Sequence, residues 1–284
     1  MNVDFVRFHA SDGAELRGWL TRDISDIAVI HVHGMSGNGY ENHFLDDLRE
    51  MFHKHGVSFF TIDTRGSGVI NSFWKKGDAE LLGGSCYEIF DDCVFDIQGA
   101  LEYLKTLGKS RFILMGHSLG ASKVVHYIVT QKHKEIVASL LLAPTDMVGW
   151  ANTDPNNKIY LQKAKKLLAE GKGDELVGAQ CWWDKTPISA QTYPTICESG
   201  SAADIYGEEA KIGKIDIPTI IVYGDKDMGI IKIDGSIPKW IERVNKIKNK
   251  RTEISVIQNA MHSFKDHEHE VVDVAQSFLK SVIT

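Results

Sequence analysis

Short apolar runs alternate along the chain with longer segments in which apolar residues recur every three or four positions. Runs that are apolar at consecutive positions are typical of strands buried on both faces. Their alternation with amphipathic segments predicts an α/β fold, with a mostly parallel central sheet and helices on both faces. The expected buried strands are residues 27–33, 57–62, 111–115, 136–142, 218–223 and 253–257.

The chain is expected to begin with an antiparallel hairpin. Residues 3–9 and 15–20 flank Ser11-Asp12-Gly13, and an Asp-Gly pair supplies the positive-φ positions of a tight turn. Apolar residues at helical spacing predict amphipathic helices on the sheet around positions 44–52, 90–104, 124–128 and 271–282.

One segment, residues 149–213, interrupts the alternation. It contains a helical stretch at 160–168, followed by Cys181-Trp182-Trp183, and it is too long for a plain loop. We expect it to form a small helical cap over one end of the sheet, while residues 1–148 and 214–284 fold as one core. Trp182 and Trp183 are candidates for the roof of a substrate pocket, or they hold the insertion onto the core.

The composition is that of an ordinary globular protein, with 43% hydrophobic and 25% charged residues. Lysine and arginine number 32 against 38 acids, a net charge of −6, which offers no basic surface to nucleic acid or anionic lipid. The first ten residues do not resemble a secretion signal, and no apolar run approaches the ~20 residues of a membrane span. A cytoplasmic location is therefore expected, with neither nucleic acid nor membrane as a partner.

A chemically informative motif follows the strand at 111–115. The residues Gly116-His117-Ser118-Leu119-Gly120 stand between this strand and an amphipathic helix, which is the strand, GxSxG, helix order of a nucleophile elbow. The glycines are needed because the central serine sits in a strained turn, where side chains two positions away would collide with neighbouring elements.

Together with this elbow, three further features resemble the α/β-hydrolase superfamily, and the resemblance covers nearly the whole chain. They are the loop His33-Gly34-Met35-Ser36-Gly37 after the third strand, the run Asp63-Thr64-Arg65-Gly66-Ser67-Gly68 after the fourth, and a late aspartate and histidine. The resemblance implies a serine hydrolase of the capped carboxylesterase type. It is least informative in the segment 149–213, where members of the superfamily differ most in substrate choice.

A serine hydroxyl needs a base within hydrogen-bond reach and an anion that orients this base. His262, after the strand at 253–257, resembles the family's catalytic histidine, which comes last in the order serine, acid, histidine. The family pattern selects Asp227 in Tyr223-Gly224-Asp225-Lys226-Asp227 as the acid. Asp225 is expected to form a turn, and Asp146 is a third candidate.

Backbone N–H groups are expected to stabilise the negative charge of the tetrahedral intermediate. One donor should be Leu119, which follows the nucleophile in the elbow, and the resemblance implies Met35 as the second.

No cofactor and no metal are expected. The GxGxxG order and the GxxxxGK[ST] motif are both absent. His31 and His33 are interpreted as satisfied core histidines, and Asp63 and Arg65 as bracing of a loop. The run His267-Glu268-His269-Glu270 opens a helix, where acids complement the dipole. Cys86, Cys93, Cys181 and Cys197 lack a metal-site spacing and are expected to be buried thiols.

These features predict a hydrolase that cleaves ester or thioester bonds of small soluble substrates through an acyl-enzyme on Ser118. The same residues could cleave a lactone or a carbon–carbon bond under a different cap. A serine at the elbow argues against the epoxide hydrolase and dehalogenase branches, which would require an aspartate there. A non-catalytic ligand-binding protein on the same fold is a further alternative, because a fold by itself does not establish activity. Oligomeric state is left open.

Overall fold

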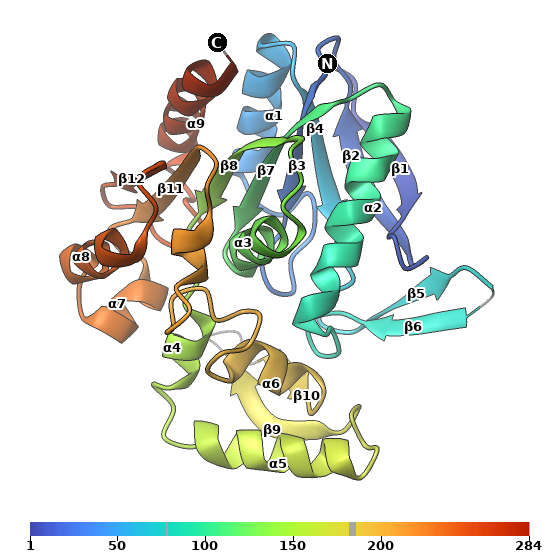
Figure 1. Cartoon of the computed structure of the whole chain (residues 1–284), viewed down its shortest axis with the longest axis vertical. Coiled ribbons are helices and arrows are strands. Elements are labelled where there is room, and N and C mark those ends of the chain that lie inside the picture. Colours follow the sequence, from blue (N-terminus) through green and yellow to red (C-terminus); the bar gives the residue numbers. More distant parts are fainter. Residues whose placement is uncertain (78, 182–185, 284) are drawn as a thin grey trace.

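The fold is built on one eight-stranded sheet, seen in the computed structural model, which describes residues 1–77, 79–181 and 186–283 (Figure 1). The two strands at one edge are antiparallel to their neighbours and the others are parallel, as the sequence predicts. In spatial order the strands are β1 (Asp4–His9), β2 (Glu15–Thr21), β4 (Ser58–Asp63), β3 (Ile27–Val32), β7 (Arg111–His117), β8 (Ile136–Leu142), β11 (Thr219–Gly224) and β12 (Thr252–Ile257).

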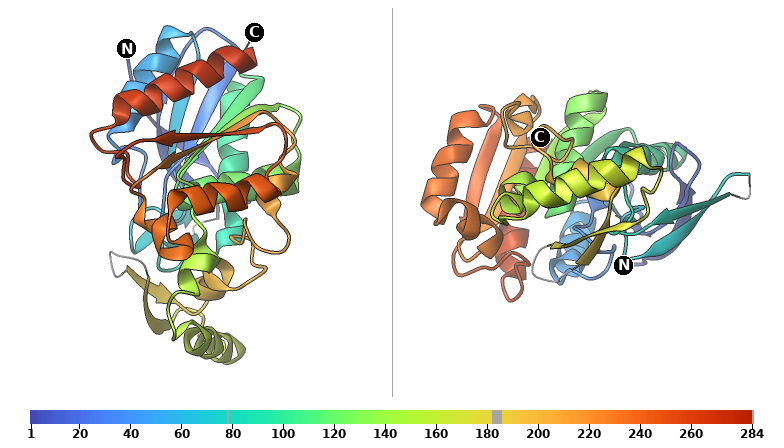
Figure 2. Two further views of the ribbon diagram at one scale, coloured as in Figure 1. Left: turned by 90° about the vertical axis from the view of Figure 1, so that its left-hand side faces the viewer. Right: turned by 90° about the horizontal axis from the view of Figure 1, so that it is seen from below.

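Helices cover both faces of this sheet, and each face has its own apolar cluster (Figure 2). On one face, α1 (Phe44–Lys54) and α9 (Glu268–Ile283) pack side by side over residues such as Phe59 and Met115. On the other face lie α2 (Cys93–Thr106), α3 (Leu119–Gln131) and α8 (Ile237–Ile247), over residues such as Phe60 and Leu114. In the described part of the chain, no helix is both long and apolar enough to cross a membrane.

A second hairpin, which the hydrophobic pattern did not predict, projects beyond the edge of the sheet (Figure 1). It consists of β5 (Asn71–Lys75) and β6 (Ala79–Gly83). Phe73 is its one buried apolar side chain among the described residues, while Trp74 is exposed. With so few buried positions, these strands have no strong period-two pattern.

Most of the segment 149–213 lies below the sheet in Figure 1, and the segment is not purely helical. The expected helical stretch is present as α5 (Asn157–Ala169), but a short hairpin of β9 (Leu176–Cys181) and β10 (Thr186–Ser189) accompanies it, so the insertion is not helical throughout. Alternate burial of Val177 and Ala179 gives β9 its strand pattern. The other elements of this region are α4 (Met147–Ala151), α6 (Thr192–Cys197) and η2 (Lys211–Lys214).

This segment does not pack as one unit. Tyr193 and Ile196 join Phe90 and Leu119 in a third apolar cluster, which links the insertion to the first residue of α3. Further along the chain, Ile205, Tyr206 and Ile212 instead belong to the cluster beneath α3 and α8. Two short elements stand outside the insertion: η1 (Phe90–Asp92) directly precedes α2, and α7 (Met228–Asp234) precedes α8.

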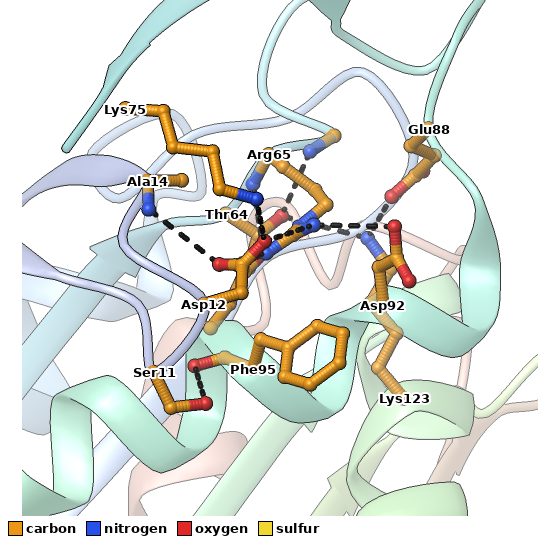
Figure 3. A network of polar contacts seen from close by, with 12 residues as sticks. Ser11, Asp12, Ala14, Thr64, Arg65, Lys75, Glu88, Asp92, Phe95 and Lys123 are labelled. Atoms are coloured by element: carbon orange, nitrogen blue, oxygen red, sulfur yellow. Dashed lines mark hydrogen bonds and ion pairs between the residues drawn. The ribbon is translucent and has the colours of Figure 1, made fainter. Parts of the chain in front are cut away.

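A network of buried charges braces the loop after β4 (Figure 3). The Arg65 side chain is 3% exposed and donates from Nε and Nη2 to Asp96 Oδ1, at 2.9 and 2.8 Å, while its backbone N–H donates to the other carboxylate oxygen. Asp12 and Asp92 also contact the guanidinium. This is the bracing role expected of Arg65.

Replacing Arg65 by methionine should lower the free energy of unfolding by about 3–5 kcal/mol, because the fully buried Asp96 carboxylate would lose its counter-ion. Urea denaturation of the wild type and the variant measures this loss. The matched control is Arg111→Met, which removes a pair exposed on both sides, with Asp26, and should have a much smaller effect. Equal losses in both variants would contradict the bracing role.

Candidate active site

The turn between β7 and α3 places Ser118 at the carboxyl end of the parallel strands. Ser118 has φ 57° and ψ −125°, a left-handed conformation that costs a non-glycine residue free energy. A Cβ on Gly116 would lie 2.5 Å from the Gly120 carbonyl oxygen, and a Cβ on Gly120 would overlap the Val32 and His33 carbonyls. The elbow expected from the sequence is therefore present, and both glycines are required by close backbone approach.

His262 reaches the serine from the loop between β12 and α9. Its Nε2 lies 2.8 Å from Ser118 Oγ. Two contacts hold this loop: the buried His117 donates from Nε2 to the His262 carbonyl oxygen at 2.9 Å, and the Lys226 N–H donates to the Ala260 carbonyl oxygen at 2.9 Å. Residues separated by 144 positions are thus brought together as the sequence predicted.

Asp227 lies in the turn between β11 and α7 and is fully buried. Its Oδ2 is 2.8 Å from His262 Nδ1, and its Oδ1 accepts the Gly229 N–H at 2.8 Å at the start of α7. Because a buried carboxylate accepts hydrogen bonds, Nδ1 of His262 carries a proton and donates to Asp227. Nε2 of the neutral ring is then an acceptor, and the Ser118 hydroxyl donates to it.

The two other acidic candidates lie elsewhere. Asp225 accepts the Asn259 N–H at 2.6 Å and thereby holds the loop that leads to His262, where Asn259 adopts a positive φ of 63°. Asp146 accepts the Gly149 N–H at the start of α4 and pairs with Arg243 at 2.8 Å. Of the three aspartates, Asp227 is the one that contacts the imidazole.

The loop after β3 passes directly beside the nucleophile. A Cβ on Gly34 would lie 3.1 Å from the Ser118 Cβ, so the backbone that leads into the half-buried Met35 is adjacent to the elbow. His33 donates from Nδ1 to the Gly34 carbonyl oxygen at 2.7 Å and accepts the Thr64 N–H at Nε2, which orients the peptide between Gly34 and Met35. Leu119 is the first residue of α3, where backbone N–H groups have no acceptor within the helix.

Thr145 is a contact of the serine that the sequence does not predict. Its Oγ1 lies 3.1 Å from Ser118 Oγ and its side chain is buried. The residue follows β8 at the same edge of the sheet, which is the one signal in the sequence that could have drawn attention to it. Threonine at a strand end has many structural uses, so this position alone names no role.

The remaining sequence predictions have mixed outcomes. Trp182 and Trp183 lie outside the described residues, as does the side chain of Cys181; the thiols of Cys86, Cys93 and Cys197 are buried. His33 is a satisfied core histidine as expected. For His31 that expectation is wrong, because neither ring nitrogen of this fully buried side chain has a hydrogen-bond partner in the described residues. Within the same residues, no three His, Cys, Asp or Glu side chains could jointly hold a metal ion.

A comparison with protein-family models assigns the chain to a family. A model described as a protein of unknown function, DUF1749, matches residues 85–283, which include the elbow, Asp227 and His262. The chain belongs to the DUF1749 family. No curated protein matches its sequence.

The DUF1749 chain has the α/β-hydrolase fold, as solved structures similar to it show. The α/β hydrolase GrgF from Penicillium sp. sh18 matches with a TM-score of 0.74 and 18% identity, over 100% of this chain and 99% of the other. Est1E from Butyrivibrio proteoclasticus, with ferulic acid bound, matches with a TM-score of 0.68 and 18% identity over 97% and 98%. The Pyrococcus furiosus esterase Pf2001 matches with 0.63 and 18% over 100% and 92%.

Three buried histidines near the site have pKa values far below the usual value of a histidine. Burial, with the charge of Lys123, lowers the pKa of His33 to about 3. Burial, with the neighbouring His262, lowers the pKa of His117 to about 3, and burial also holds the pKa of His31 well below its usual range. Asp63 changes stability in the opposite direction with pH, because burial raises its pKa to about 6.

The free energy of unfolding should therefore fall as the pH drops from 7 towards 4. The unfolded chain takes up protons on these histidines near their usual pKa of 6.5, whereas the native protein does so only at much lower pH. Each histidine contributes up to about 1.4 kcal/mol per pH unit, and Asp63, protonated earlier in the native state, offsets one of the three. Urea unfolding at pH 7.5 and 5.0 measures the difference.

His31→Leu is the matched variant for this pH dependence, because it removes one proton-binding site and a buried ring that has no hydrogen-bond partner among the described residues. Its stability should decline less steeply with acid than that of the wild type. A wild-type free energy of unfolding that is unchanged or higher at pH 5.0 would contradict this effect of the buried histidines.

Proposed function

We propose that this protein is a serine hydrolase that cleaves carboxylic ester or thioester bonds of small soluble substrates through an acyl-enzyme on Ser118. The observation that carries the proposal is one continuous chain of hydrogen bonds. It runs from Ser118 Oγ through the two ring nitrogens of His262 to the buried Asp227 carboxylate, with both distances at 2.8 Å. A neutral histidine between a hydroxyl and a buried carboxylate is the arrangement that activates a serine.

The reaction begins when Ser118 Oγ attacks the substrate carbonyl carbon and its proton passes to His262 Nε2. The carbonyl electron pair moves to the oxygen, and Asp227 stabilises the imidazolium that has formed. His262 then returns the proton to the leaving alcohol or thiol as the bond from carbon to that group breaks. Water repeats the sequence on the acyl-enzyme and releases the acid.

The oxyanion of each tetrahedral intermediate would accept hydrogen bonds from the backbone N–H groups of Met35 and Leu119. The closeness of the Gly34 backbone to Ser118 supports Met35, and the place of Leu119 at the start of α3 supports the second donor. Each such donor is worth roughly a hundredfold to a thousandfold in rate.

We propose that residues 149–213 form a cap that helps to select the substrate. The chain leaves the carboxyl end of β8 beside the nucleophile, and Tyr193 and Ile196 pack in one apolar cluster with Leu119. The ferulic acid bound to the similar Est1E and the esterase activity named for Pf2001 support an ester substrate. Lactone and carbon–carbon hydrolysis would use the same residues, so a screen over esters, thioesters, lactones and β-diketones separates these activities.

Ser118→Ala should abolish hydrolysis of short p-nitrophenyl esters and labelling by a fluorophosphonate, because no other atom would take the place of Oγ. Steady-state kinetics and gel fluorescence measure the two effects. A folded wild type that neither hydrolyses these esters nor reacts with the probe would favour a ligand-binding protein on the hydrolase fold.

The acid is tested with a pair of substitutions. Asp227→Asn should lower kcat by about 10³–10⁴, because an amide no longer favours the productive tautomer of His262. Asp225→Asn should leave kcat nearly unchanged, because an amide oxygen can still accept the Asn259 N–H. Similar losses in both variants, with folding verified by circular dichroism, would argue against this assignment of the acid.

A further inference from the structure

The hydroxyl of Thr145 is a second hydrogen-bonding partner of the nucleophile. Thr145 is 6% exposed, and its Oγ1 lies 3.1 Å from Ser118 Oγ. The same Ser118 oxygen is also contacted by His262 Nε2. Thr145 comes from the loop after β8, so it approaches the serine from a different element than the histidine does.

The direction of this hydrogen bond follows from the other protons of the site. In the neutral imidazole, Nδ1 of His262 carries the one ring proton and donates to Asp227, so Nε2 is an acceptor and takes the single proton of the Ser118 hydroxyl. Ser118 Oγ then acts as an acceptor towards Thr145. The Thr145 hydroxyl is consequently the donor, and in the described residues its Oγ1 has no other hydrogen-bond partner.

We infer that Thr145 is a further catalytic residue, which donates a hydrogen bond to the reacting oxygen whenever that oxygen carries negative charge. The inference rests on the proposed function of Ser118. As the serine proton moves to His262 Nε2, Oγ holds three lone pairs: one faces the imidazolium, one accepts from Thr145, and the third forms the bond to the carbonyl carbon. In deacylation the bond from carbon to Oγ breaks, and Thr145 stabilises the departing oxygen until His262 returns its proton.

The surrounding contacts keep the Thr145 hydroxyl in place. Ser122, one turn along α3 from the nucleophile, donates from Oγ to the Thr145 carbonyl oxygen at 3.2 Å. The preceding carbonyl, of Pro144, accepts the Tyr206 hydroxyl at 3.3 Å, and Tyr206 in turn accepts from Tyr223 at 2.8 Å. The donor is therefore pre-oriented, which is the condition under which a hydrogen bond assists a reaction without reorganisation.

This arrangement also connects the insertion to the chemistry. Tyr206 comes from the last part of the segment 149–213 and is buried in the cluster beneath α3 and α8. Through Pro144 it holds the peptide that carries Thr145. The loop after β8 is thus anchored both by the helix that begins at the nucleophile and by the segment that would cover the site.

The test compares Thr145→Val, which replaces the hydroxyl by a methyl group of similar size, with Thr145→Ser, which retains it. With a short p-nitrophenyl ester, Val should lower kcat about 10- to 100-fold, the effect of one hydrogen bond to a charged atom, and KM should change little. Ser should recover kcat to within a few-fold of the wild type. The second-order rate of fluorophosphonate labelling should follow the same order.

Thr219→Val is the matched control, because Thr219 is fully buried on β11 and its hydroxyl forms a hydrogen bond with Ser139, away from the site. It should leave kcat unchanged. If Thr145→Val does not fold, as judged by its melting temperature, the Thr145→Ala and Thr145→Ser pair makes the same comparison.

A folded Thr145→Val protein with wild-type kcat, or a Ser variant as impaired as Val, would overturn the role of the hydroxyl while the serine mechanism stands. A wild type that does not react with the fluorophosphonate, or a Ser118→Ala protein that still hydrolyses the ester, would instead overturn the proposed function itself.

Discussion

The close contact between the start of α3 and the end of β3 is the constraint on which the site depends. Gly120 approaches the Val32 and His33 carbonyls so closely that no Cβ fits there. A Cβ on Gly116 would likewise collide with the carbonyl oxygen of Gly120. The helix can therefore start immediately after the strand, and Ser118 is held at φ 57° in the turn between them. The same contact brings the Gly34 backbone against the serine. One packing requirement thus sets the nucleophile and its neighbouring amide loop together.

Buried polar groups hold the loops that surround this turn. Lys123, on α3, forms a fully buried ion pair with Glu88 at 2.6 Å, and Arg65 forms another with Asp96. The charge of Lys123 also helps to keep His33 neutral, the form in which this ring both donates to the Gly34 carbonyl and accepts from Thr64. Burying so many charges and neutral histidines is costly unless each has a partner. The geometry of the site therefore depends on which of these buried groups are charged and which are neutral.

The parts of the fold that followed from the sequence were those with a local pattern. Consecutive apolar residues marked the buried strands, and the spacing of Phe44, Leu48 and Phe52 marked α1. The hydrophobic pattern does not predict the hairpin of β5 and β6, because its strands bury few side chains. It does not predict the hairpin within the insertion either, because β9 and β10 are only six and four residues long. The expectation of a satisfied histidine at His31 is wrong, because a sequence carries no record of whether a buried ring finds a partner.

The sequence by itself determined the order of the chemistry: a serine between two glycines after a strand, then an acid and a histidine after two later strands. Parallel strands place their carboxyl ends along one edge, so this order was enough to predict that Ser118, His262 and an aspartate of the turn after the strand at 218–223 would meet. Only the tertiary structure decided which of Asp225 and Asp227 reaches the imidazole, because the two differ by the direction of a side chain in one turn. It alone revealed Thr145, whose contact with Ser118 arises from the packing of β8 beside β7. Such contacts depend on distances between elements, and residue spacing along the chain does not encode them.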